Sequence, residues 1–478
     1  MPSWDRLYIG GDWVDPSSSS KIEVISPFTT EVIGSTPEAQ NADVDRAVAA
    51  ARAAFDEWAL TPVAERKEVL TRVLNGYAAR MDEMAELITD EMGSPTSFAK
   101  IAQAPIAWMT LNTFLGYADT YPWEEARQGA FGKVLVRREA VGVVAAIVPW
   151  NVPQFVTMTK LAPALLSGCA VVLKPAPETP LDAFVLAEIA EAAGLPAGLL
   201  NIVPAGREVG EYLVSHPGID KVAFTGSTAA GRRIASICGE QLKRCSLELG
   251  GKSASIVLDD ADLTAVANGL KGASFMNNGQ ACVAQTRVLA SRARYDEVVE
   301  ALAEMTRSLV IGDPSDPSTD IGPLVAERQQ ERVEKYIALG QEEGARVVVG
   351  GNGAPKGFER GWFVQPTLFA APSNDLRIAQ VEIFGPVVTV IPYDDVDDAV
   401  RIANDSEYGL AGSVWSADVE AGIDIARRVR TGTYGVNSGS GMDLGAPFGG
   451  YKSSGMGREL GPEGINAYVE YKTISVPA

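Results

Sequence analysis

Apolar residues recur along the chain with two different spacings, one typical of amphipathic helices and one typical of buried strands. Residues 41–57 have apolar side chains at helical spacing behind a capping Asn or Asp, and residues 63–92 continue as helix. Residues 133–147 are instead typical of strands. The first third of the chain therefore predicts a long helical region followed by strands.

From residue 160 onward, short apolar runs alternate with amphipathic stretches. Such alternation is typical of parallel strands that are joined by crossover helices, and a second series of the same kind runs from about 285 to 440. The first series predicts strands over residues 170–175, 198–204, 221–226 and 253–260, and helices over residues 180–194, 207–216 and 227–240.

Length and charge narrow the class of protein. A chain of 478 residues suggests two or three domains, and 46% apolar with 21% charged residues is an ordinary balance for a soluble globular protein. The net charge is −20, which suits neither a nucleic-acid backbone nor an anionic membrane surface. We therefore expect neither nucleic acid nor membrane as a partner, and an anionic cofactor would need a local basic or backbone-amide site.

The most apolar stretch, residues 140–173, does not predict a membrane helix. Prolines, amides and Lys160 interrupt it, so it lacks the uninterrupted apolar run of about 18 residues that a span needs. The first residues also lack a basic region followed by an apolar one, so we expect no signal peptide.

Cysteine and histidine are scarce. The four cysteines, Cys169, Cys238, Cys245 and Cys282, have no CxxC spacing, and His216 is the single histidine. Neither a zinc site nor a disulfide scaffold is expected from such a set, and we expect no metal. A reducing, cytoplasmic location fits this composition best. His216 and the first three cysteines are interpreted as structural.

Several familiar motifs are absent. No stretch satisfies GxGxxG or GxSxG, and the P-loop-like spacing at 226–232 has Arg232 where a lysine is required. What remains is a series of short polar segments that follow strands and contain glycine or proline. They are PWNVP (149–153), LKPAPETP (173–180), FTGST (224–228), ELGGK (248–252), NNGQAC (277–282), EIFGP (382–386) and PFGGYKSSGMGRELG (447–461).

In this order the seven segments resemble those of the NAD(P)-dependent aldehyde dehydrogenase superfamily, and the likeness runs from about residue 7 to the C-terminus. ELGGK followed 34 positions later by the Cys of GQAC is the most specific feature, together with the closing segment. The resemblance implies an α/β fold with a Rossmann-like cofactor domain, an α/β catalytic domain and a small β oligomerisation arm. The expected boundaries are 1–121 and 141–250 for the cofactor domain, 251–450 for the catalytic domain, and 122–140 and 469–478 for the arm.

The resemblance also implies a covalent mechanism. Cys282 would attack the aldehyde as a thiolate, and Asn151 with the backbone N–H of Cys282 would stabilise the oxyanion, one such donor typically contributing roughly 3 kcal/mol. Hydride passes to the nicotinamide, and Glu248 would activate the water that hydrolyses the thioester. Glu248 is also a candidate to take the Cys proton, directly or through water. Lys160 and Glu459 match family positions that support proton transfer and cofactor turnover. Their role is either structural support or direct chemistry.

Cofactor contacts follow from the same segments. Ser227, at a helix start, matches the pyrophosphate contact, because backbone amides and the helix dipole favour an anion there. Lys174 and Glu382 match contacts to the two ribose units. The full set of expected cofactor residues is Val148, Pro149, Trp150, Lys174, Pro177, Gly206, Gly210, Phe224, Gly226, Ser227, Leu249, Gly250, Glu382 and Phe384.

One cofactor position departs from the family pattern. Members that prefer NAD usually have a glutamate three residues after the lysine, and here that residue is Pro177. Its loss removes both a ribose contact and the repulsion that excludes a 2′-phosphate. Glu178 follows, but a one-residue shift points its side chain elsewhere. We expect NAD or NADP, with a preference for NAD because no extra basic residue lies beside Lys174.

The positions that match the family's substrate tunnel are apolar and include no Lys or Arg. This favours a neutral, fairly bulky aliphatic, terpenoid or aromatic aldehyde over a carboxylated semialdehyde. The positions are Val152, Phe155, Val156, Thr159, Ala281, Val283, Met442 and Phe448.

Two other functions stay open. A CoA-acylating relative would release the thioester to CoA, although that branch typically lacks the Glu248 base. A structural or binding protein would keep the fold without catalysis, although Cys282, Glu248 and Asn151 are all present. Because an arm can pair with a neighbour's sheet, a homodimer or homotetramer is expected.

Overall fold

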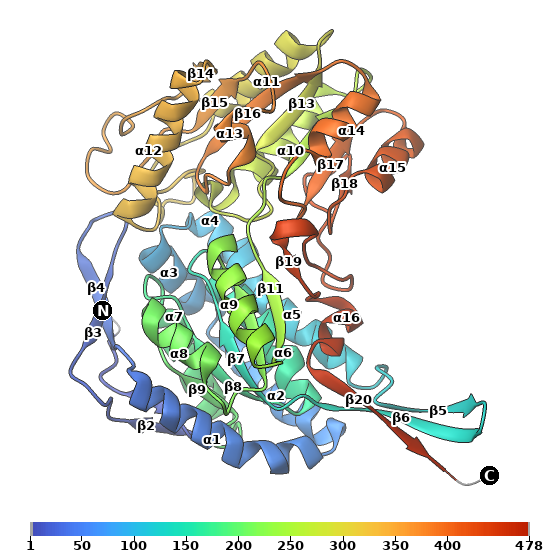
Figure 1. The fold of residues 1–478 in the computed structure, drawn as a ribbon. Coiled ribbons are helices and arrows are strands. Elements are labelled where there is room, and N and C mark those ends of the chain that lie inside the picture. The colour runs from blue at the N-terminus through green and yellow to red at the C-terminus, as the bar shows by residue number, and fades with distance from the viewer. Residues whose placement is uncertain (1–2, 477–478) are drawn as a thin grey trace.

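The computed structural model describes residues 3–476 and contains two α/β units and a projecting β arm (Figure 1). Each unit has its own mostly parallel sheet, which confirms the predicted fold class. No helix within the described residues is both long and apolar enough to cross a membrane.

The first unit is built on an eight-stranded sheet. Its five central strands are parallel, and every residue of 143–147 and 170–174 is buried, which explains why these strands lack an apolar–polar alternation. The sheet contains β1 (Leu7–Ile9), β2 (Asp12–Val14), β7 (Val143–Ile147), β8 (Ala170–Lys174), β9 (Leu200–Ile202), β10 (Lys221–Thr225), β11 (Arg244–Glu248) and β19 (Gly455–Met456).

The strand order of this sheet determines where a ligand can bind. The order is β19-β11-β10-β7-β8-β9-β1-β2, so the chain runs outward from β7 in one direction and from β10 in the other. Ligands of open α/β sheets bind beyond the carboxyl ends of the strands at such a switch point. The segments that follow β7 and β10, beginning at Val148 and Gly226, therefore flank the expected binding crevice.

Helices cover both faces of this sheet, as the alternating pattern predicts. The predicted helix over 63–92 is interrupted at Arg80, whose side chain pairs with Glu83 and Glu188. The elements are α1 (Asn41–Leu60), α2 (Val63–Ala79), α3 (Met81–Met92), α4 (Thr96–Phe98), a π-helical turn (Ala99–Gln103), α5 (Ala104–Tyr117), α6 (Pro153–Ser167), α7 (Leu181–Ala192), α8 (Arg207–Ser215) and α9 (Thr228–Glu240), with the hairpin β3 (Lys21–Ile25) and β4 (Val32–Pro37).

The second unit has a seven-stranded sheet of order β14-β15-β16-β13-β12-β17-β18. Its strands are β12 (Ala254–Val257), β13 (Arg287–Ser291), β14 (Arg346–Val349), β15 (Thr367–Ala370), β16 (Val387–Tyr393), β17 (Gly412–Trp415) and β18 (Gly435–Val436). The helices and turns after residue 260 are α10 (Leu263–Phe275), a 3₁₀ turn (Met276–Gly279), α11 (Tyr295–Arg307), α12 (Glu327–Glu342), α13 (Arg377–Gln380), α14 (Val396–Asn404), α15 (Val419–Arg428), a 3₁₀ turn (Lys452–Ser454) and α16 (Gly461–Asn466).

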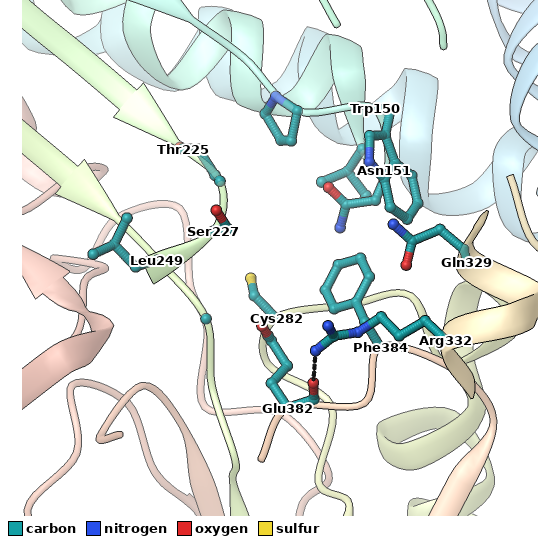
Figure 2. Close-up of a pocket in the computed structure, with 14 residues that line it drawn as sticks. Trp150, Asn151, Thr225, Ser227, Leu249, Cys282, Gln329, Arg332, Glu382 and Phe384 are labelled. Carbon is teal, nitrogen blue, oxygen red and sulfur yellow. Dashed lines mark hydrogen bonds between the residues drawn. The ribbon is translucent and has the colours of Figure 1, made fainter. Parts of the chain in front are cut away.

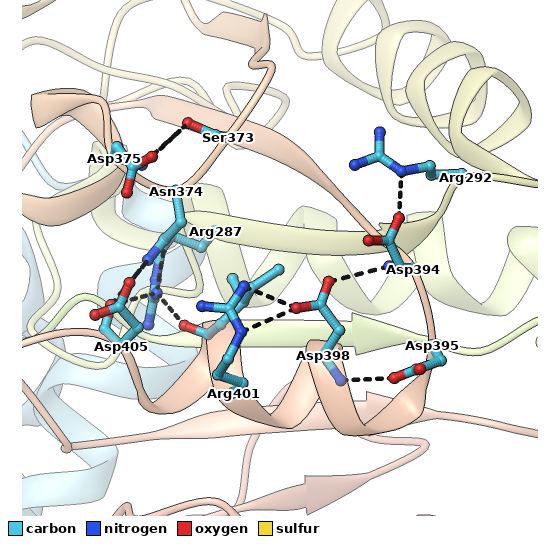
Figure 3. Close-up of polar contacts among 11 residues, drawn as sticks. Arg287, Arg292, Ser373, Asn374, Asp375, Asp394, Asp395, Asp398, Arg401 and Asp405 are labelled. Atoms are coloured by element: carbon cyan, nitrogen blue, oxygen red, sulfur yellow. Dashed lines mark hydrogen bonds and ion pairs between the residues drawn. The ribbon is translucent and has the colours of Figure 1, made fainter.

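A buried arginine connects the segments of the second unit that lead to the crevice. Arg287 is 1% exposed, and its guanidinium donates to the carbonyl oxygens of Lys252 at 3.0 Å and of Ile402 and Ala403 at 3.0 Å each. It also donates to Asn374 Oδ1 at 3.1 Å (Figure 3). Arg287 therefore links the end of ELGGK to the C-terminus of α14. Arg287 itself follows the segment that contains Cys282.

The arm is a three-stranded antiparallel sheet that projects from the first unit and carries the C-terminus (Figure 1). It consists of β5 (Glu124–Gly129), β6 (Gly132–Ala140) and β20 (Val469–Ser475), in the order β20-β6-β5. These strands lie within the two segments predicted for the arm, of which residues 477–478 lie outside the described residues. Phe131 at the hairpin tip is fully exposed.

Candidate active site

A cavity of about 240 Å³ opens where the segments after β7 and β10 meet loops of the second unit (Figure 2). It brings together parts of PWNVP, FTGST, ELGGK, NNGQAC and EIFGP, which are far apart in the sequence. The residues that line it are Pro149, Trp150, Asn151, Val152, Thr225, Gly226, Ser227, Leu249, Gly250, Cys282, Gln329, Arg332, Glu382 and Phe384.

The loop before Cys282 has an unusual backbone. Asn277, Asn278 and Gly279 have φ values of 53°, 61° and 72°, so three consecutive residues are left-handed. Asparagine tolerates this region better than most side chains do. A Cβ on Gly279 would lie 2.3 Å from the carbonyl carbon of Gly385, so only glycine fits there. The sequence Asn277-Asn278-Gly279 therefore favours the tight turn that presents Cys282 to the cavity.

Buried amides hold this turn in place. Asn277 Nδ2 donates to the backbone oxygen of Asn151 at 2.8 Å, and Asn277 Oδ1 accepts from Ser94 Oγ at 2.9 Å and from Gln103 Nε2 at 3.2 Å. All four residues are at most 5% exposed. This network fixes the Cys loop and the PWNVP segment relative to each other.

Asn278 anchors the other side of the turn. Its Nδ2 donates to the carbonyl oxygens of Gly93 and Pro323 at 2.8 Å each, and its Oδ1 accepts from Gly322 N at 2.7 Å. Because the side chain is fully buried and both ends of its amide are used, the turn has little freedom to shift.

Asn151 and Cys282 face the same cavity. Asn151 Nδ2 donates to the carbonyl oxygen of Gln280 at 2.8 Å, which leaves its second N–H free to stabilise an oxyanion. Figure 2 shows the Cys282 sulfur pointing into the cavity. Burial raises the pKa of the Cys282 thiol to about 12, and the carboxylates of Glu382 and Glu248 add to the effect. The resting thiol is therefore protonated at neutral pH.

Glu248 is the last residue of β11 and is 4% exposed. Within residues 3–476 neither of its carboxylate oxygens has a well-formed hydrogen-bond partner. Burial, and then the neighbouring carboxylate of Glu459, raises the pKa of Glu248 well above its usual value. A carboxylate with free oxygens and a raised pKa is suited to accept a proton. Its charge contributes to the raised pKa of Cys282, although Glu248 itself lines neither the first nor the second cavity.

Lys160 and Glu459 form a buried ion pair behind the cavity. Lys160 Nζ lies 2.6 Å from Glu459 Oε1 and donates to Thr225 Oγ1 at 2.7 Å. Thr225 lines the cavity and is aligned with Glu248 in the parallel pairing of β10 and β11. The other Glu459 oxygen accepts from Thr159 Oγ1 at 2.7 Å. Thr159, expected to line the tunnel, is 1% exposed.

The two glycines of ELGGK allow a close approach to the second unit. A Cβ on Gly250 would lie 2.4 Å from Glu382 Oε2, and one on Gly251 would lie 2.2 Å from the carbonyl oxygen of Cys282. Glu382 Oε1 accepts from Gly251 N at 3.0 Å, and burial raises the pKa of Glu382 to about 7. Arg332 donates to the Glu382 carbonyl oxygen at 2.6 Å (Figure 2).

The cavity has features that fit a dinucleotide. Ser227 is the N-cap of α9, and its Oγ accepts from Ala230 N at 3.3 Å, so the start of a 13-residue helix faces the cavity. The N-terminus of a helix favours an anionic group such as a pyrophosphate. A Cβ on Gly226 would lie 2.5 Å from the ring of Phe224, which keeps the backbone there open to close approach. The residues present therefore fit the cofactor that the sequence implies.

A second cavity, of about 120 Å³, lies between α8 and α9. Its walls are apolar, with charged groups at the edge, which suits an adenosine. It is lined by Ile147, Lys174, Arg207, Gly210, Glu211, Val214, Phe224, Ala230, Arg233, Ile234 and Ile237. Of the expected cofactor residues, Val148, Pro177 and Gly206 line neither cavity.

Two arginines in the second cavity change the expectation for the cofactor. Arg207 and Arg233 line it together with Lys174, so the premise that no extra basic residue lies beside this lysine is wrong. Both arginines come from later helices, far from Lys174 in sequence. Arg233 pairs with Glu211 at 2.6 Å. Glu178 instead forms an ion pair with Arg328 of α12 and does not replace the missing glutamate at Pro177.

The expected substrate residues do not share one cavity. Only Val152 lines the first one, whereas Val152, Phe155, Val283 and Met442 pack as partly buried side chains on the same hydrophobic cluster as Cys282. The remaining positions, Val156, Thr159, Ala281 and Phe448, line neither cavity.

Sequence reasoning missed several lining residues. Thr225 lies inside the FTGST segment, which was a usable signal. Gln329 and Arg332 come from α12, and Arg207 and Arg233 from α8 and α9, where ordinary amphipathic helices carry no motif. Only the packing of the two units brings α12 to the crevice.

Comparisons with known proteins agree with this geometry. The family model described as "Aldehyde dehydrogenase family" matches residues 13–474. The chain is 49% identical over 472 residues to geranial dehydrogenase of Castellaniella defragrans, and the match covers 98% of both chains. A Mycobacterium tuberculosis aldehyde dehydrogenase solved with NAD+ has a TM-score of 0.97 and 52% identity, covering 99% of this chain and 98% of the other. Aldehyde dehydrogenase C of Pseudomonas syringae, solved as a variant with NAD+ and octanal, has a TM-score of 0.96 and 40% identity, covering 98% and 96%.

Proposed function

The chain belongs to the aldehyde dehydrogenase family and is an NAD(P)-dependent oxidoreductase, and we propose that it oxidises a neutral, apolar aldehyde to its carboxylic acid through a thioester on Cys282. The observation that carries the proposal is the arrangement around the first cavity. Cys282 and Asn151 face one space, and the carboxylate of Glu248, which has no well-formed partner within residues 3–476, contributes to the raised pKa of Cys282.

The first step forms a C–S bond. Cys282 loses its proton to solvent water, and its sulfur attacks the aldehyde carbon. With a pKa of about 12, the free thiol ionises in roughly one molecule in 10⁵ at neutral pH. A positive charge in the cavity would lower this pKa. The oxyanion that forms accepts hydrogen bonds from the free N–H of Asn151 and from the backbone N–H of Cys282.

The second step produces the acid. NAD(P)+, when bound, would supply the hydride acceptor, and collapse of the oxyanion with loss of hydride would leave a thioester on Cys282. Glu248 then takes a proton from water, the hydroxide adds to the thioester carbon, and the C–S bond breaks to release the carboxylic acid. Glu382, Trp150, Phe384 and Ser227 would hold the cofactor, since they line the same cavity.

Single-turnover kinetics test this mechanism. Glu248→Gln should give a burst of about one NAD(P)H per active site and then almost no turnover, with an acyl group on Cys282 visible by intact mass spectrometry. Glu297→Gln, an exposed glutamate of α11, is the matched control. Wild-type turnover in Glu248→Gln would contradict the assignment of the base. Product release that requires added CoA would instead identify the CoA-acylating alternative.

The charges around the expected substrate positions favour a neutral aldehyde. Phe155, Val152 and Met442 are apolar, and the exposed residue next to Met442 is Asp443. The charges of Glu463 and Asp443 both act on Tyr117, so this region is acidic and would repel a carboxylated semialdehyde. The relatives named for geranial and solved with octanal point to the same class of substrate.

A substrate panel tests this assignment. Geranial and octanal should have a kcat/KM at least tenfold higher than that of succinic semialdehyde. The opposite order would contradict the proposal for the substrate and leave the proposed chemistry at Cys282 intact.

For the cofactor, the proposal is that NAD is used and that NADP is accepted as well. Pro177 leaves no carboxylate to repel a 2′-phosphate, and Arg207 and Arg233 add positive charge to the cavity that contains Lys174. The ratio of kcat/KM for NAD to that for NADP measures the preference. A ratio above about 10³ would contradict the acceptance of NADP.

The arm is proposed to mediate a homodimer or homotetramer. β5 is an edge strand of the arm, and Tyr471 and Ile474 of β20 are exposed apolar side chains. Light scattering after size exclusion measures the mass in solution, and a monomer would contradict this role.

A further inference from the structure

We propose that Thr159 is a positioning residue, whose hydroxyl holds the Glu459 carboxylate and thereby controls how readily Glu248 accepts a proton from the hydrolytic water. The inference rests on the proposed function, in which Glu248 is the base for thioester hydrolysis. It assigns to Thr159 a role that differs from the tunnel wall expected from the sequence.

Two consecutive residues of α6 hold the two oxygens of Glu459. Thr159 Oγ1 lies 2.7 Å from Glu459 Oε2, and Lys160 Nζ lies 2.6 Å from Glu459 Oε1. Successive residues of a helix point about 100° apart, so the two donors approach the carboxylate from different sides. Thr159 and Lys160 are at most 1% exposed and Glu459 is 5% exposed, so no bulk water competes for these bonds.

The Thr159 hydroxyl has a second acceptor within reach. Its Oγ1 lies 2.9 Å from the carbonyl oxygen of Val156. A hydroxyl has one proton and two lone pairs, so Thr159 can donate to only one of these acceptors at a time. An ionised Glu459 attracts the proton, because a carboxylate is the stronger acceptor. The proton of Thr159 therefore points to Glu459.

Thr159 pairs the Glu459 oxygen that Lys160 does not reach. Without this donor, that oxygen would be left without a partner in a buried site, which is unfavourable. The two donors together hold the carboxylate in one orientation, and this orientation sets how its charge acts on Glu248.

The link from Glu459 to Glu248 is electrostatic and short. The charge of Glu459 raises the pKa of Glu248, whereas Lys160 lowers it. Lys160 also donates to Thr225, which lies beside Glu248 in the sheet. Buried charges are poorly screened, so a small change in the Glu459 carboxylate acts strongly on Glu248.

The backbone around Glu459 is rigid, which leaves the side chain as the part that Thr159 controls. Glu459 and Phe448 exchange two backbone hydrogen bonds of 2.7 Å each. Leu460 follows with a φ of 58°, in the left-handed region. The main chain therefore delivers Glu459 to one position, and the bonds to Lys160 and Thr159 orient its carboxylate.

The neighbouring positions support the same conclusion. Val152, Phe155 and Val156 share the face of α6 with Thr159, and all three are apolar. A buried hydroxyl on an apolar face is unfavourable unless it is hydrogen-bonded. The bond to Glu459 explains why a threonine is tolerated at this position.

The test compares Thr159→Val, which is nearly isosteric, with Thr159→Ser, which keeps the hydroxyl. Thr157→Val is the matched control, because Thr157 is a buried threonine of α6 without a side-chain hydrogen bond among the described residues. We expect Thr159→Val to lower steady-state kcat about tenfold or more, with the burst of NAD(P)H and the cofactor KM unchanged. Without the donor, Glu459 acts on Glu248 with its full charge, so the acid limb of the kcat–pH profile should move to higher pH.

Thr159→Ser should restore both kcat and the pH profile. A Thr159→Val enzyme with the kcat and pH profile of Thr157→Val overturns the inference, and so does a change in aldehyde KM alone, which would identify a tunnel wall. Thr159→Ala provides a second variant if the valine protein does not fold. Glu248→Gln in the same assay separates the two hypotheses: wild-type turnover there refutes the proposed base, whereas a burst without turnover leaves only the role of Thr159 in question.

Discussion

Two supports behind the crevice are held in shape by different chemistry. Around Cys282, neutral amides fix the backbone, with Asn277 bonded to Asn151, Ser94 and Gln103. Beyond the loop after β8, the first N–H groups of α7 are capped by a carboxyl group. Glu91 accepts from Leu181 N at 3.0 Å and from Asp182 N at 3.3 Å.

Protonation should affect these two supports differently. Amides do not titrate, so the frame of Cys282 keeps its hydrogen bonds at every pH at which the protein is folded. Glu91 and Asp182 are at most 1% exposed, and burial raises the pKa of both, that of Asp182 to about 7. The chemistry at Cys282 therefore rests on amides that do not titrate, whereas the start of α7 rests on a pair of carboxyl groups whose pKa values are raised.

The largest expected effect is the loss of activity when Cys282 is replaced, and the hydrogen bonds that hold its turn should stay intact. Cys282→Ala should lower turnover by about 10⁴-fold or more, because no other nucleophile lines the cavity at that position. The melting temperature should stay within about 2 °C of the wild type, since no side-chain hydrogen bond of the turn involves the thiol. Steady-state kinetics and thermal unfolding measure the two quantities. A large loss of stability would contradict this expectation.

Removing an amide side chain that holds the Cys282 turn should lower stability and activity together. Asn277→Ala loses four side-chain hydrogen bonds and leaves buried partners unsatisfied, at a cost of about 3 kcal/mol or more. Alanine also tolerates the left-handed φ of 53° poorly. The melting temperature and kcat should both fall. Asn277→Gly keeps the backbone conformation and loses only the amide, so any difference between the two variants measures the strain.

These contrasts also define what the sequence could predict. Local patterns predict many of the strands and helices, whereas the arm and most residues of the first cavity were expected from the family resemblance of the seven segments. β11 was not predicted, since only its last three residues are buried and its pairing with β10 is made across α9. Arg207, Arg233 and Arg332 lie on helices without a motif, and only the tertiary packing places them at the crevice.

Thr159 shows a different limit of prediction from the sequence. The family resemblance predicted that Thr159 is a tunnel wall, together with the apolar residues Val152, Phe155 and Val156. The hydrogen bond to Glu459 joins residues 300 positions apart, and no local pattern encodes it. A polar residue at an apolar position was the available signal.

At the second cavity, cofactor preference should change with single charges. Arg207→Ala should lower kcat/KM for NADP about tenfold relative to NAD, because a charge-assisted hydrogen bond contributes roughly 1.5–3 kcal/mol. Pro177→Glu should disfavour NADP by a similar factor through repulsion of the 2′-phosphate. Titration of each cofactor against the protein gives the binding constants independently of turnover. Equal effects on NAD and NADP would show that these residues do not discriminate between them.

The smallest expected effect concerns pH. Asp182 has a folded-state pKa of about 7 and an ordinary value near 3.8 in the unfolded chain. Between these values the folded protein retains a proton that the unfolded chain has lost, so the contribution of Asp182 to stability is present below pH 4 and is lost as the pH rises to 7. Asp182→Asn removes this dependence. From pH 6 to pH 7 the variant should therefore lose less stability than the wild type, by about 1 kcal/mol.

Thermal unfolding of both proteins at pH 6 and pH 7 measures this difference. The comparison of the two supports also predicts where the change occurs. Hydrogen exchange at pH 8 should increase in the first turn of α7, which Glu91 caps, and should stay unchanged in the turn at 277–279, whose side-chain partners come from amides. Equal increases in both would show that the carboxyl pair supports the whole crevice, because the start of α7 and the Cys282 turn would then open together.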